Sequence, residues 1–383
     1  GVGGVACSTL GAATATGPFS DTVSGLTPDT TYHVRAYATN RAGTVYGGGV
    51  VFTTQREARA LGATCGTNSE CASGLCSTDA VDADNRRCVP LELPSAAGGA
   101  MEFRYVPATG GGGFTQGSPS GESGRGTDET QWQSTTTRAT FVGRTEVTQG
   151  QWKTATGGLN PSYFQNTTCT DGTCSSTENA NNSGPVERVD WWSSAAYANW
   201  LSEQAGLARC YAFTPSDWDR TVSNWSDGNG ANGLPATGIT WSGPGCAGYR
   251  LPTESEWEWA ARGSVASGSL TTAYYWGASV DSAYAWYSAN SGSRTQSVGG
   301  KLPNAYGLRD MSGNVWEWAW DWYDSYPSEP RSDYSGPASG VERTYRSGSW
   351  FNLGPIARSA NRSSDAPAHR DSNLGLRVAR TVP

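Results

Sequence analysis

The stretch that decides the fold runs from residue 306 to 322 and reads YGLRDMSGNVWEWAWDW. Its second half alternates, which is typical of an extended segment whose successive side chains point to opposite faces. One face then carries Asn314, Trp316, Trp318 and Trp320, and the other carries Val315, Glu317 and Ala319. Acids beside buried indoles need a cation or a metal to offset their desolvation. The stretch therefore predicts a binding site.

Three motifs, in order along the chain, carry a family resemblance. They are RLPTESEWEWAARG at 250–263, GLRDMSGNVWEW at 307–318, and GSW at 348–350 with NLGLRV at 373–378. Together they resemble the formylglycine-generating enzyme, or sulfatase-modifying factor, family over residues 101–383. The resemblance implies an α+β, loop-rich variant of the C-type lectin fold, but a fold does not settle activity.

The composition describes a helix-poor, aromatic-rich protein. The 383 residues include 50 glycines and 17 tryptophans but only 2 methionines, and the length suits two or three domains. No apolar run is long enough to span a bilayer, so we expect no membrane span. The net charge of -7, without a basic cluster, argues against a nucleic-acid partner.

Residues 1–54 are similar to part of a fibronectin type III domain, an all-β sandwich. The stretch LTPDTTY at 26–32 resembles its tyrosine corner, and strands are expected at 31–39 and 45–53. Too little chain precedes the segment 19–25 to complete this partial sandwich. We therefore expect upstream residues or a neighbouring chain to add a strand, which would also permit self-assembly. Linkers are expected at 55–64 and 90–100.

Cysteine spacing predicts disulfides rather than a zinc site. Segment 65–89 holds four cysteines without a C-x2-C pair and reads as a two-disulfide knot, with its connectivity open. A small loop between two cysteines and a staple across 211–245 are the other expected bridges, and Cys7 is left over. The cysteines concerned are Cys65, Cys71, Cys76 and Cys88 in the knot, Cys169 with Cys174, and Cys210 with Cys246. This usage predicts an extracellular or cell-surface location.

Helices are expected where capping residues precede apolar periodicity. Thr148 with Gln151, and Thr253 with Glu256, form capping boxes, and Gly263 can end the second helix. A third helix is expected from residue 190, with Trp192, Ala196 and Trp200 on one face.

The family resemblance implies one calcium site. Its ligands map onto the Asp310 side chain, the carbonyl oxygens of Gly313 and Val315, and the Glu317 carboxylate. Hard oxygen donors of this kind are what calcium selects. The alternative is that Asp310 and Glu317 pair with Arg309 or Arg377. A second family calcium site would fall at 283–293, where the expected acid is missing.

The family's oxidase chemistry has lost its metal ligands in this chain. Formylglycine-generating enzymes need two cysteines shortly after the GSW motif to bind copper, and residues 348–362 contain none. The related iron-dependent branch needs a histidine cluster, whereas this chain has only His33 and His369. We expect no copper or iron. From what remains of the family's cleft, the resemblance predicts a ligand groove formed by Trp316, Ser349, Trp350, Phe351, Arg358 and Asn373.

Other catalytic arrangements are poorly supported. A serine-histidine-aspartate site would have to use His369, whose surroundings indicate a solvated loop. An acid pair for glycoside hydrolysis could be drawn from Asp321, Asp324 and Glu329, but spacing selects no pair.

These observations lead to three hypotheses about the function of the protein. The leading hypothesis is an extracellular, non-catalytic family member that binds a protein or glycan ligand. The second is an active oxidase or other enzyme that uses a different residue set. The third is a structural subunit of a surface appendage. Redox-active copper or iron retained after purification would favour the second over the first, whereas calcium alone would favour the first.

Overall fold

The computed structural model describes residues 31–53, 63, 76, 91–92, 101–165, 182–216, 218–224, 237–263 and 272–383. The chain divides into two units, Gly1–Ala58 and Arg59–Pro383. Within the described ranges, every helix is too short or too polar to cross a membrane.

The described part of the first unit is a hairpin. Strand β1 (Thr31–Asn40) pairs antiparallel with β2 (Gly43–Thr53), as the two strands predicted from the sequence require. Val50 and Val51 of β2 are 64% and 57% exposed. The segment 19–25 lies outside the described residues, so the fibronectin-like sandwich and its completion by an added strand stay predictions.

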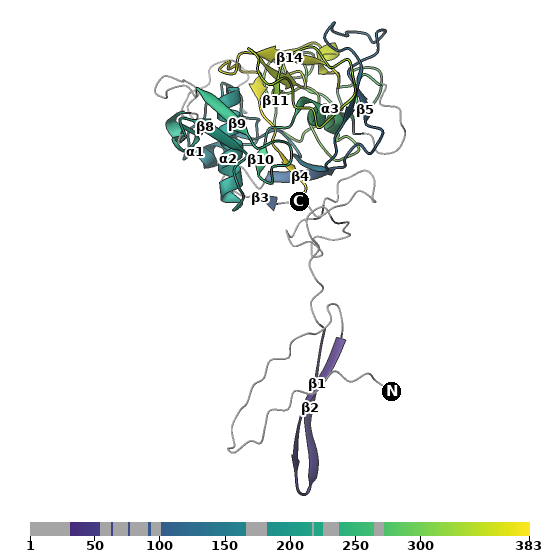
Figure 1. The fold of residues 1–383 in the computed structure, drawn as a ribbon, viewed down its shortest axis with the longest axis vertical. Helices are drawn as coiled ribbons and strands as arrows, with labels where there is room; N and C mark the ends of the chain where they lie inside the picture. The colour runs from purple at the N-terminus through teal and green to yellow at the C-terminus, as the bar shows by residue number, and fades with distance from the viewer. Residues whose placement is uncertain are drawn as a thin grey trace. The chain divides into compact units, whose positions relative to one another are not determined.

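Two sheets cross the middle of the second unit. The first has the order β10-β16-β7-β4-β3, and the second has the order β14-β13-β11-β15. Their strands are β3 (Leu91–Glu92), β4 (Met101–Val106), β7 (Thr140–Gly143), β10 (Tyr249–Arg250), β11 (Trp316–Trp322), β13 (Arg343–Arg346), β14 (Arg362–Asp365), β15 (Leu374–Gly375) and β16 (Ala379–Thr381). Figure 1 shows β4 and β10 below β11 in this unit.

Two smaller sheets lie at the edges. They have the orders β12-β6-β5 and β8-β9. The strands are β5 (Phe114–Gln116), β6 (Trp132–Thr135), β8 (Tyr211–Thr214), β9 (Gly238–Trp241) and β12 (Arg331–Ser332), and the short 3-10 turns are η3 (Trp218–Arg220), η4 (Val222–Asn224) and η5 (Gly354–Ala357).

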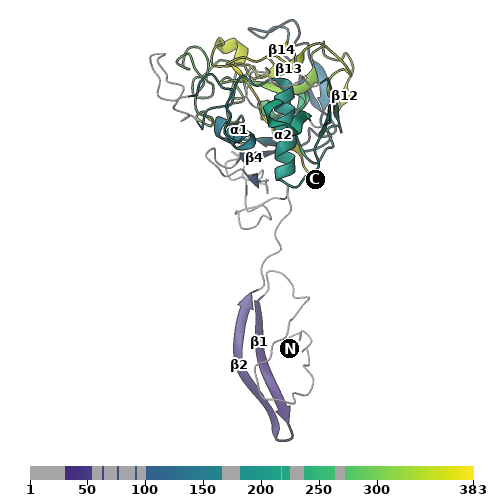
Figure 2. The ribbon, with the colours of Figure 1, turned by 90° about the vertical axis from the view of Figure 1, so that its left-hand side faces the viewer.

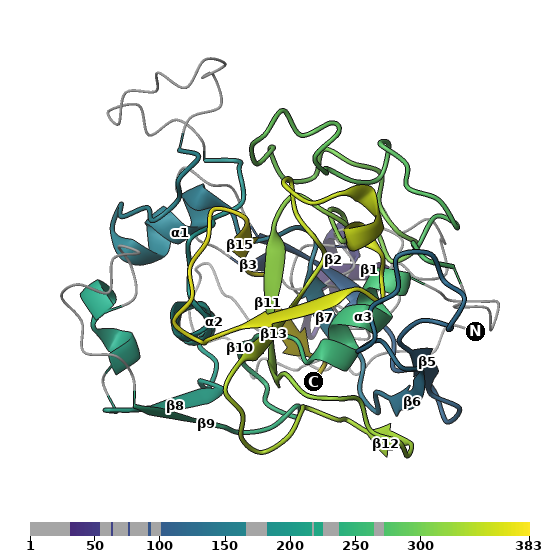
Figure 3. The ribbon, with the colours of Figure 1, turned by 90° about the horizontal axis from the view of Figure 1, so that it is seen from above.

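Helices flank β11 on both sides. Helices α1 (Gln149–Thr156) and α2 (Trp191–Gln204) lie on one side of β11 and α3 (Glu254–Arg262) on the other, as Figure 3 shows from above. Figure 2 shows α2 along its length, below β13 and β14. One buried core contains Trp316 and Trp318 with residues of α1 and α2, and a second contains Trp257 of α3. Strand β11 is therefore buried between two cores.

The predicted helix ends are confirmed. Thr148 and Thr253 cap α1 and α3, each in a reciprocal capping box with the residue three positions on, and Gly263 ends α3 with a left-handed φ of 59°. The predicted face of α2 is only partly correct. Trp192 and Trp200 are half-buried, whereas Trp191 is fully buried. Because α2 packs on more than one side, its innermost positions are not the ones that a single stripe selects.

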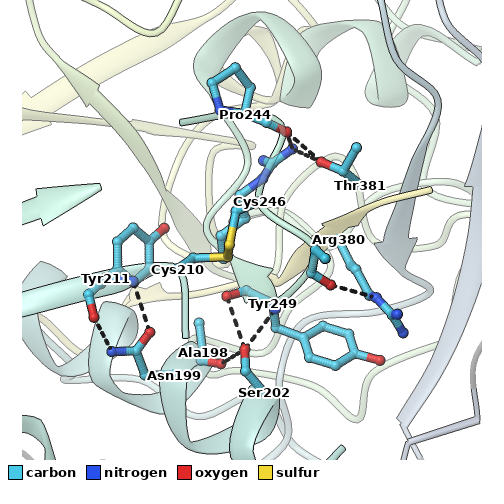
Figure 4. Close-up of a disulfide and its surroundings, with 12 residues drawn as sticks. Ala198, Asn199, Ser202, Cys210, Tyr211, Pro244, Cys246, Tyr249, Arg380 and Thr381 are labelled. Atoms are coloured by element: carbon cyan, nitrogen blue, oxygen red, sulfur yellow. Dashed lines mark hydrogen bonds between the residues drawn. A yellow bond between two sulfur atoms is a disulfide. The ribbon is translucent and has the colours of Figure 1, made fainter. Parts of the chain in front are cut away.

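The predicted staple between Cys210 and Cys246 is present, with an S–S distance of 2.05 Å (Figure 4). It joins residues next to β8 and β10. Beside it, the Ser202 hydroxyl accepts a hydrogen bond from Tyr249 N over 2.7 Å, which ties α2 to β10. Of the four cysteines of the predicted knot, Cys76 lies within the residues that the structure describes, and it is disulfide-bonded. The other knot cysteines, Cys65, Cys71 and Cys88, and the pair Cys169 and Cys174 lie outside the described residues.

The acids of α3 are buried and paired with arginines. Trp257 and Ala260 pack into the core as predicted, but the alternate acids of ESEWE are buried too, none more than 8% exposed. Each accepts hydrogen bonds from an arginine at 2.6 to 2.8 Å: Glu256 from Arg250, Glu254 from Arg346 and Arg362, and Glu258 from Arg262 and Arg346. Arginines of β10, β13 and β14 therefore form ion pairs with one helix, α3.

Glu258→Gln should lower the free energy of unfolding by about 3 to 5 kcal/mol, because it leaves buried arginines without their counter-charge. Glu258 holds Arg346 at 2.8 Å and both residues are fully buried. The control is Glu203→Gln, whose carboxylate is 41% exposed and pairs with Arg209 at 3.5 Å. It should cost less than about 1 kcal/mol. Urea unfolding of both variants checks this, and equal losses would contradict it.

Candidate functional site

Strand β11 places indoles on one face and an acid on the other, as its alternation predicts. The rings of Trp316 and Trp318 pack edge-on against Tyr345 of β13, with centroids 5.0 and 5.4 Å away. On the opposite face, the Glu317 carboxylate accepts a hydrogen bond from the Trp257 indole of α3 over 2.6 Å. Both faces are buried, so β11 is a scaffold strand that positions the segments around it.

The turn before β11 is held in an unusual backbone conformation. Asp310 and Asn314 have φ angles of 56° and 60°, a region that short polar side chains tolerate. Gly313 has φ 85°, and a Cβ there would lie 2.0 Å from the Trp286 carbonyl oxygen. The carbonyl oxygen of Asn314 accepts a hydrogen bond from Trp350 N over 2.8 Å. The turn therefore fixes the GSW motif beside it.

The Glu317 carboxylate forms an ion pair with an arginine. Its two carboxylate oxygens accept hydrogen bonds from Arg377 at 2.6 and 2.9 Å, and both side chains are fully buried. The Gly313 carbonyl accepts from the Ser347 hydroxyl at 3.1 Å. The expected calcium ligands are Asp310, Gly313, Val315 and Glu317, and of these Glu317 is engaged by an arginine and the Gly313 carbonyl by a hydroxyl. Among the described residues, no three His, Cys, Asp or Glu side chains are arranged to hold a metal. Calcium binding stays a prediction.

A further acid, Glu146, lies in this region and was not predicted from the sequence. Its Oε1 accepts from the Asn314 amide at 3.0 Å. Burial, and then the charge of Asp310, raise the pKa of Glu146 well above its usual range. Burial also raises the pKa of Asp310, to about 6. The only signal in the sequence is an acid at the end of a buried strand, which does not reveal its neighbours.

A row of four aromatic rings lies beside the GSW motif. Tyr163 meets Phe164, Phe164 meets Trp350, and Trp350 meets Phe351, with centroids 4.9, 5.1 and 5.5 Å apart in edge-on contacts. The outer members, Tyr163 and Phe351, are 67% and 66% exposed. We call these four residues the aromatic row. Tyr163 and Phe164 were not predicted, and an aromatic pair in a polar loop was the only signal for them.

The predicted ligand groove is only partly assembled at the surface. Trp350 and Phe351 belong to the aromatic row, and Asn373 is partly buried, with its carbonyl accepting from Trp316 N at 2.7 Å. The other three members, Trp316, Ser349 and Arg358, are at most 7% exposed.

Arg358 in particular is a structural residue and does not face a ligand. Its guanidinium binds Glu129 at 2.7 Å and Glu122 at 2.6 Å, and it is 1% exposed. The sequence could not show these partners, because both acids lie more than two hundred residues away along the chain.

Glu187 anchors the loop that carries the aromatic row. Its Oε1 accepts from Phe164 N at 2.7 Å, and its own N–H donates to the Ser162 hydroxyl at 3.2 Å. The side chain is fully buried, and this burial raises its pKa from 4.5 to about 8. A protonated carboxyl therefore holds the row in place at neutral pH.

Residues considered for hydrolytic chemistry do not converge. His369 lies 3.4 Å from Asp365 with both side chains 37% exposed, as on a solvated loop. Asp321 is buried and accepts from Glu254 N at 2.8 Å, whereas Asp324 and Glu329 are exposed.

Comparison with known proteins settles the family. Residues 104–382 match the sulfatase-modifying factor enzyme 1-like domain. The chain belongs to this family. Its large unit has the C-type-lectin-like fold that the resemblance implied. The match begins at residue 104, so it says nothing of the fibronectin-like and cysteine-rich parts.

The relatives of this domain carry names that indicate different functions. The chain is 30% identical to the chaperone protein LppX of Paenibacillus barcinonensis, over 63% of this chain and 80% of that protein. It is 33% identical to the formylglycine-generating enzyme of Streptomyces coelicolor, over 48% of this chain and 64% of the enzyme. Among solved structures, Treponema denticola variable protein 1 aligns with a TM-score of 0.58 and 30% identity, covering 77% of this chain and all of that one.

Glu187→Gln should make stability less dependent on pH. Because the pKa of Glu187 is about 8 in the folded chain and near 4.5 when exposed, the folded chain keeps one proton more between these values. This contribution to stability is present below about pH 4.5 and is lost as the pH rises through about 8. The variant should therefore lose less stability from about pH 5 to pH 8, by up to about 1.4 kcal/mol per pH unit.

Urea unfolding across this pH range measures the effect. The exposed variant Glu329→Gln serves as the control and should follow the wild-type profile. A Glu187→Gln profile as steep as that of the wild type would show that Glu187 is ionised in the folded chain.

Proposed function

We propose that this chain is a non-catalytic binding protein that recognises a protein partner through the aromatic row. The observation that supports this most is the exposure of Tyr163 and Phe351 at the two ends of a packed row. Large exposed rings on a rigid support are typical of interface anchors, because they bury much area at a small cost in side-chain entropy.

The sequence lacks the residues that bind copper or iron in the family, and this supports the proposal that the protein is not an enzyme. Residues 348–362 follow the family's GSW motif without a cysteine, and the chain holds two histidines in all. Thiolates or imidazoles are the ligands that copper and iron require. The relatives include an enzyme, a protein named as a chaperone and a protein named variable protein 1. Proteins with this fold therefore have several roles.

The surroundings of the row favour a protein over a glycan. Leu353, two residues beyond Phe351, is 71% exposed, and Val280, which lies against Gly354, is 37% exposed. Exposed aliphatic side chains beside aromatic ones favour an apolar interface core. A sugar site would instead pair a ring with planar polar groups, which leaves the aliphatic side chains without a role.

We further propose an extracellular or cell-surface location. The Cys210–Cys246 disulfide supports it, since disulfides persist in oxidising compartments. Membership of a surface appendage, with self-assembly through the first unit, is a narrower form of this proposal. The exposed valines of β2 support this narrower form, because burying their apolar side chains against another chain would be favourable.

Phe351→Ala and Tyr163→Ala should each weaken partner binding by about 30-fold, which corresponds to the roughly 2 kcal/mol of an interface anchor. A displayed random-peptide library and a glycan array, both probed with the whole chain, supply the ligands. Val341→Ala is the control, since Val341 is 82% exposed and is not part of the row.

The variants should keep the wild-type melting temperature, because the rings they remove are mostly exposed. Binding by both row variants at wild-type strength would contradict the proposal. Selective binding of glycans, with no peptide selected, would overturn the choice of a protein partner.

A further inference from the structure

Tyr163 and Phe164, which form half of the aromatic row, lie in a loop that is bonded to one buried carboxyl group. Glu187 is fully buried, and its Oε1 accepts a hydrogen bond from Phe164 N over 2.7 Å. Its own N–H donates to the hydroxyl of Ser162, directly before Tyr163. The Phe164 carbonyl accepts a further bond from the Gln149 amide over 2.9 Å. The position of these two rings therefore depends on Glu187.

The other half of the row is supported by a segment that is bonded to Arg188, the residue after Glu187. Arg188 N donates to the Asp371 carbonyl over 2.9 Å, and the Trp350 indole donates to the Ser372 carbonyl over 3.0 Å. Glu187 and Arg188 together therefore bond to the supports of both halves of the row.

The Glu187 carboxyl is buried without a compensating cation. Its Oε2 is shielded from solvent and has no hydrogen-bond partner among the described residues. The charges that act on it are half-buried Arg188 and exposed Asp371, and their effects oppose each other. The loop at 160–165 has no charged side chain, and its titratable group is the exposed phenol of Tyr163. A buried carboxylate in such surroundings is costly, so burial raises the pKa of Glu187 to about 8.

We propose that Glu187 makes partner binding by the aromatic row depend on pH. With its proton, the carboxyl stays buried and the loop at 160–165 is closed. Without its proton, the carboxylate takes up water, and the loop that is bonded to it moves away with Tyr163 and Phe164. This inference rests on the proposed function of the row, but the opening of the loop can be measured without a partner.

The direction of the pH dependence follows from proton binding. The closed loop keeps the proton up to about pH 8, whereas a hydrated carboxyl group loses it near pH 4.5. Closure is therefore favoured most below about pH 4.5, and its equilibrium constant falls by about tenfold per pH unit up to about pH 8. Above that pH it levels off. Partner affinity falls in proportion to the closed fraction, so the partner is released as the pH rises.

Hydrogen exchange of the Phe164 amide in the whole chain measures this closing equilibrium. After correction for the intrinsic exchange rate, the protection factor should fall by about tenfold per pH unit from about pH 5 to pH 8 in the wild type. In Glu187→Gln it should stay within about twofold, because the side-chain amide oxygen can still accept from Phe164 N but does not titrate. Amides of α3 should exchange more slowly than Phe164 at every pH, because the opening is local.

Peptide binding supplies the second measurement. For a peptide that the wild type selects from the displayed library at about pH 6, the affinity should fall by about tenfold or more between about pH 6 and pH 8. The affinity of Glu187→Gln should change little over this range. Glu329→Gln, at an exposed position, serves as the control and should follow the wild type.

The two measurements separate the inference from the proposed function. An exchange profile of Phe164 that is flat in the wild type, equally steep in Glu187→Gln, or identical to that of α3 would overturn the inference, as would a pH-independent peptide affinity of the wild type. The wild-type profile alone decides if Glu187→Gln does not fold. A steep exchange profile together with full peptide binding by Phe351→Ala and Tyr163→Ala would instead contradict the proposed function of the row.

Discussion

Buried ion pairs between α3 and three strands are the constraint on which the second unit depends. Arg346 of β13 reaches Glu254 and Glu258 at 2.6 and 2.8 Å, and Arg362 of β14 reaches Glu254 at 2.7 Å. Each charge is costly to bury alone and is tolerated only with its partner in place. The arginine contacts lower the pKa of Glu254 against the opposing effect of burial. Strands of two different sheets, β10 in one and β13 and β14 in the other, are therefore held together by one short helix.

This construction explains how a family scaffold persists without the family's metal ligands. The acids of α3, the cap of α3 at Thr253 and the turn at 310–314 lie in the motifs at 250–263 and 307–318, whereas the missing cysteines belong to the segment after residue 348. That segment is fixed through Trp350 N, which donates to the Asn314 carbonyl. A surface supported in this way can change its side chains with little effect on the core, and the aromatic row lies on such a surface.

Features that are local in sequence were predictable, and features that depend on distant partners were not. The capping boxes at Thr148 and Thr253 involve residues three positions apart, and both are present. The Cys210–Cys246 bridge followed from an insertion between two cysteines. Arg358 was placed at the ligand surface because the family resemblance assigns it to the cleft. Its partner Glu129 lies on another part of the chain and draws it into the core. Phe164 was missed for the same reason, since its contact with Trp350 is long-range.

We propose that the sulfatase-modifying factor scaffold serves recognition here and not oxidation. Metal content and oxygen consumption, measured together on the whole chain as purified from an oxygen-containing buffer, test it most directly. We expect no stoichiometric copper or iron and no oxygen consumption with thiol-containing peptides, whether or not calcium is bound. Copper or iron retained at one ion per chain, together with oxygen consumption that a chelator abolishes, would contradict it.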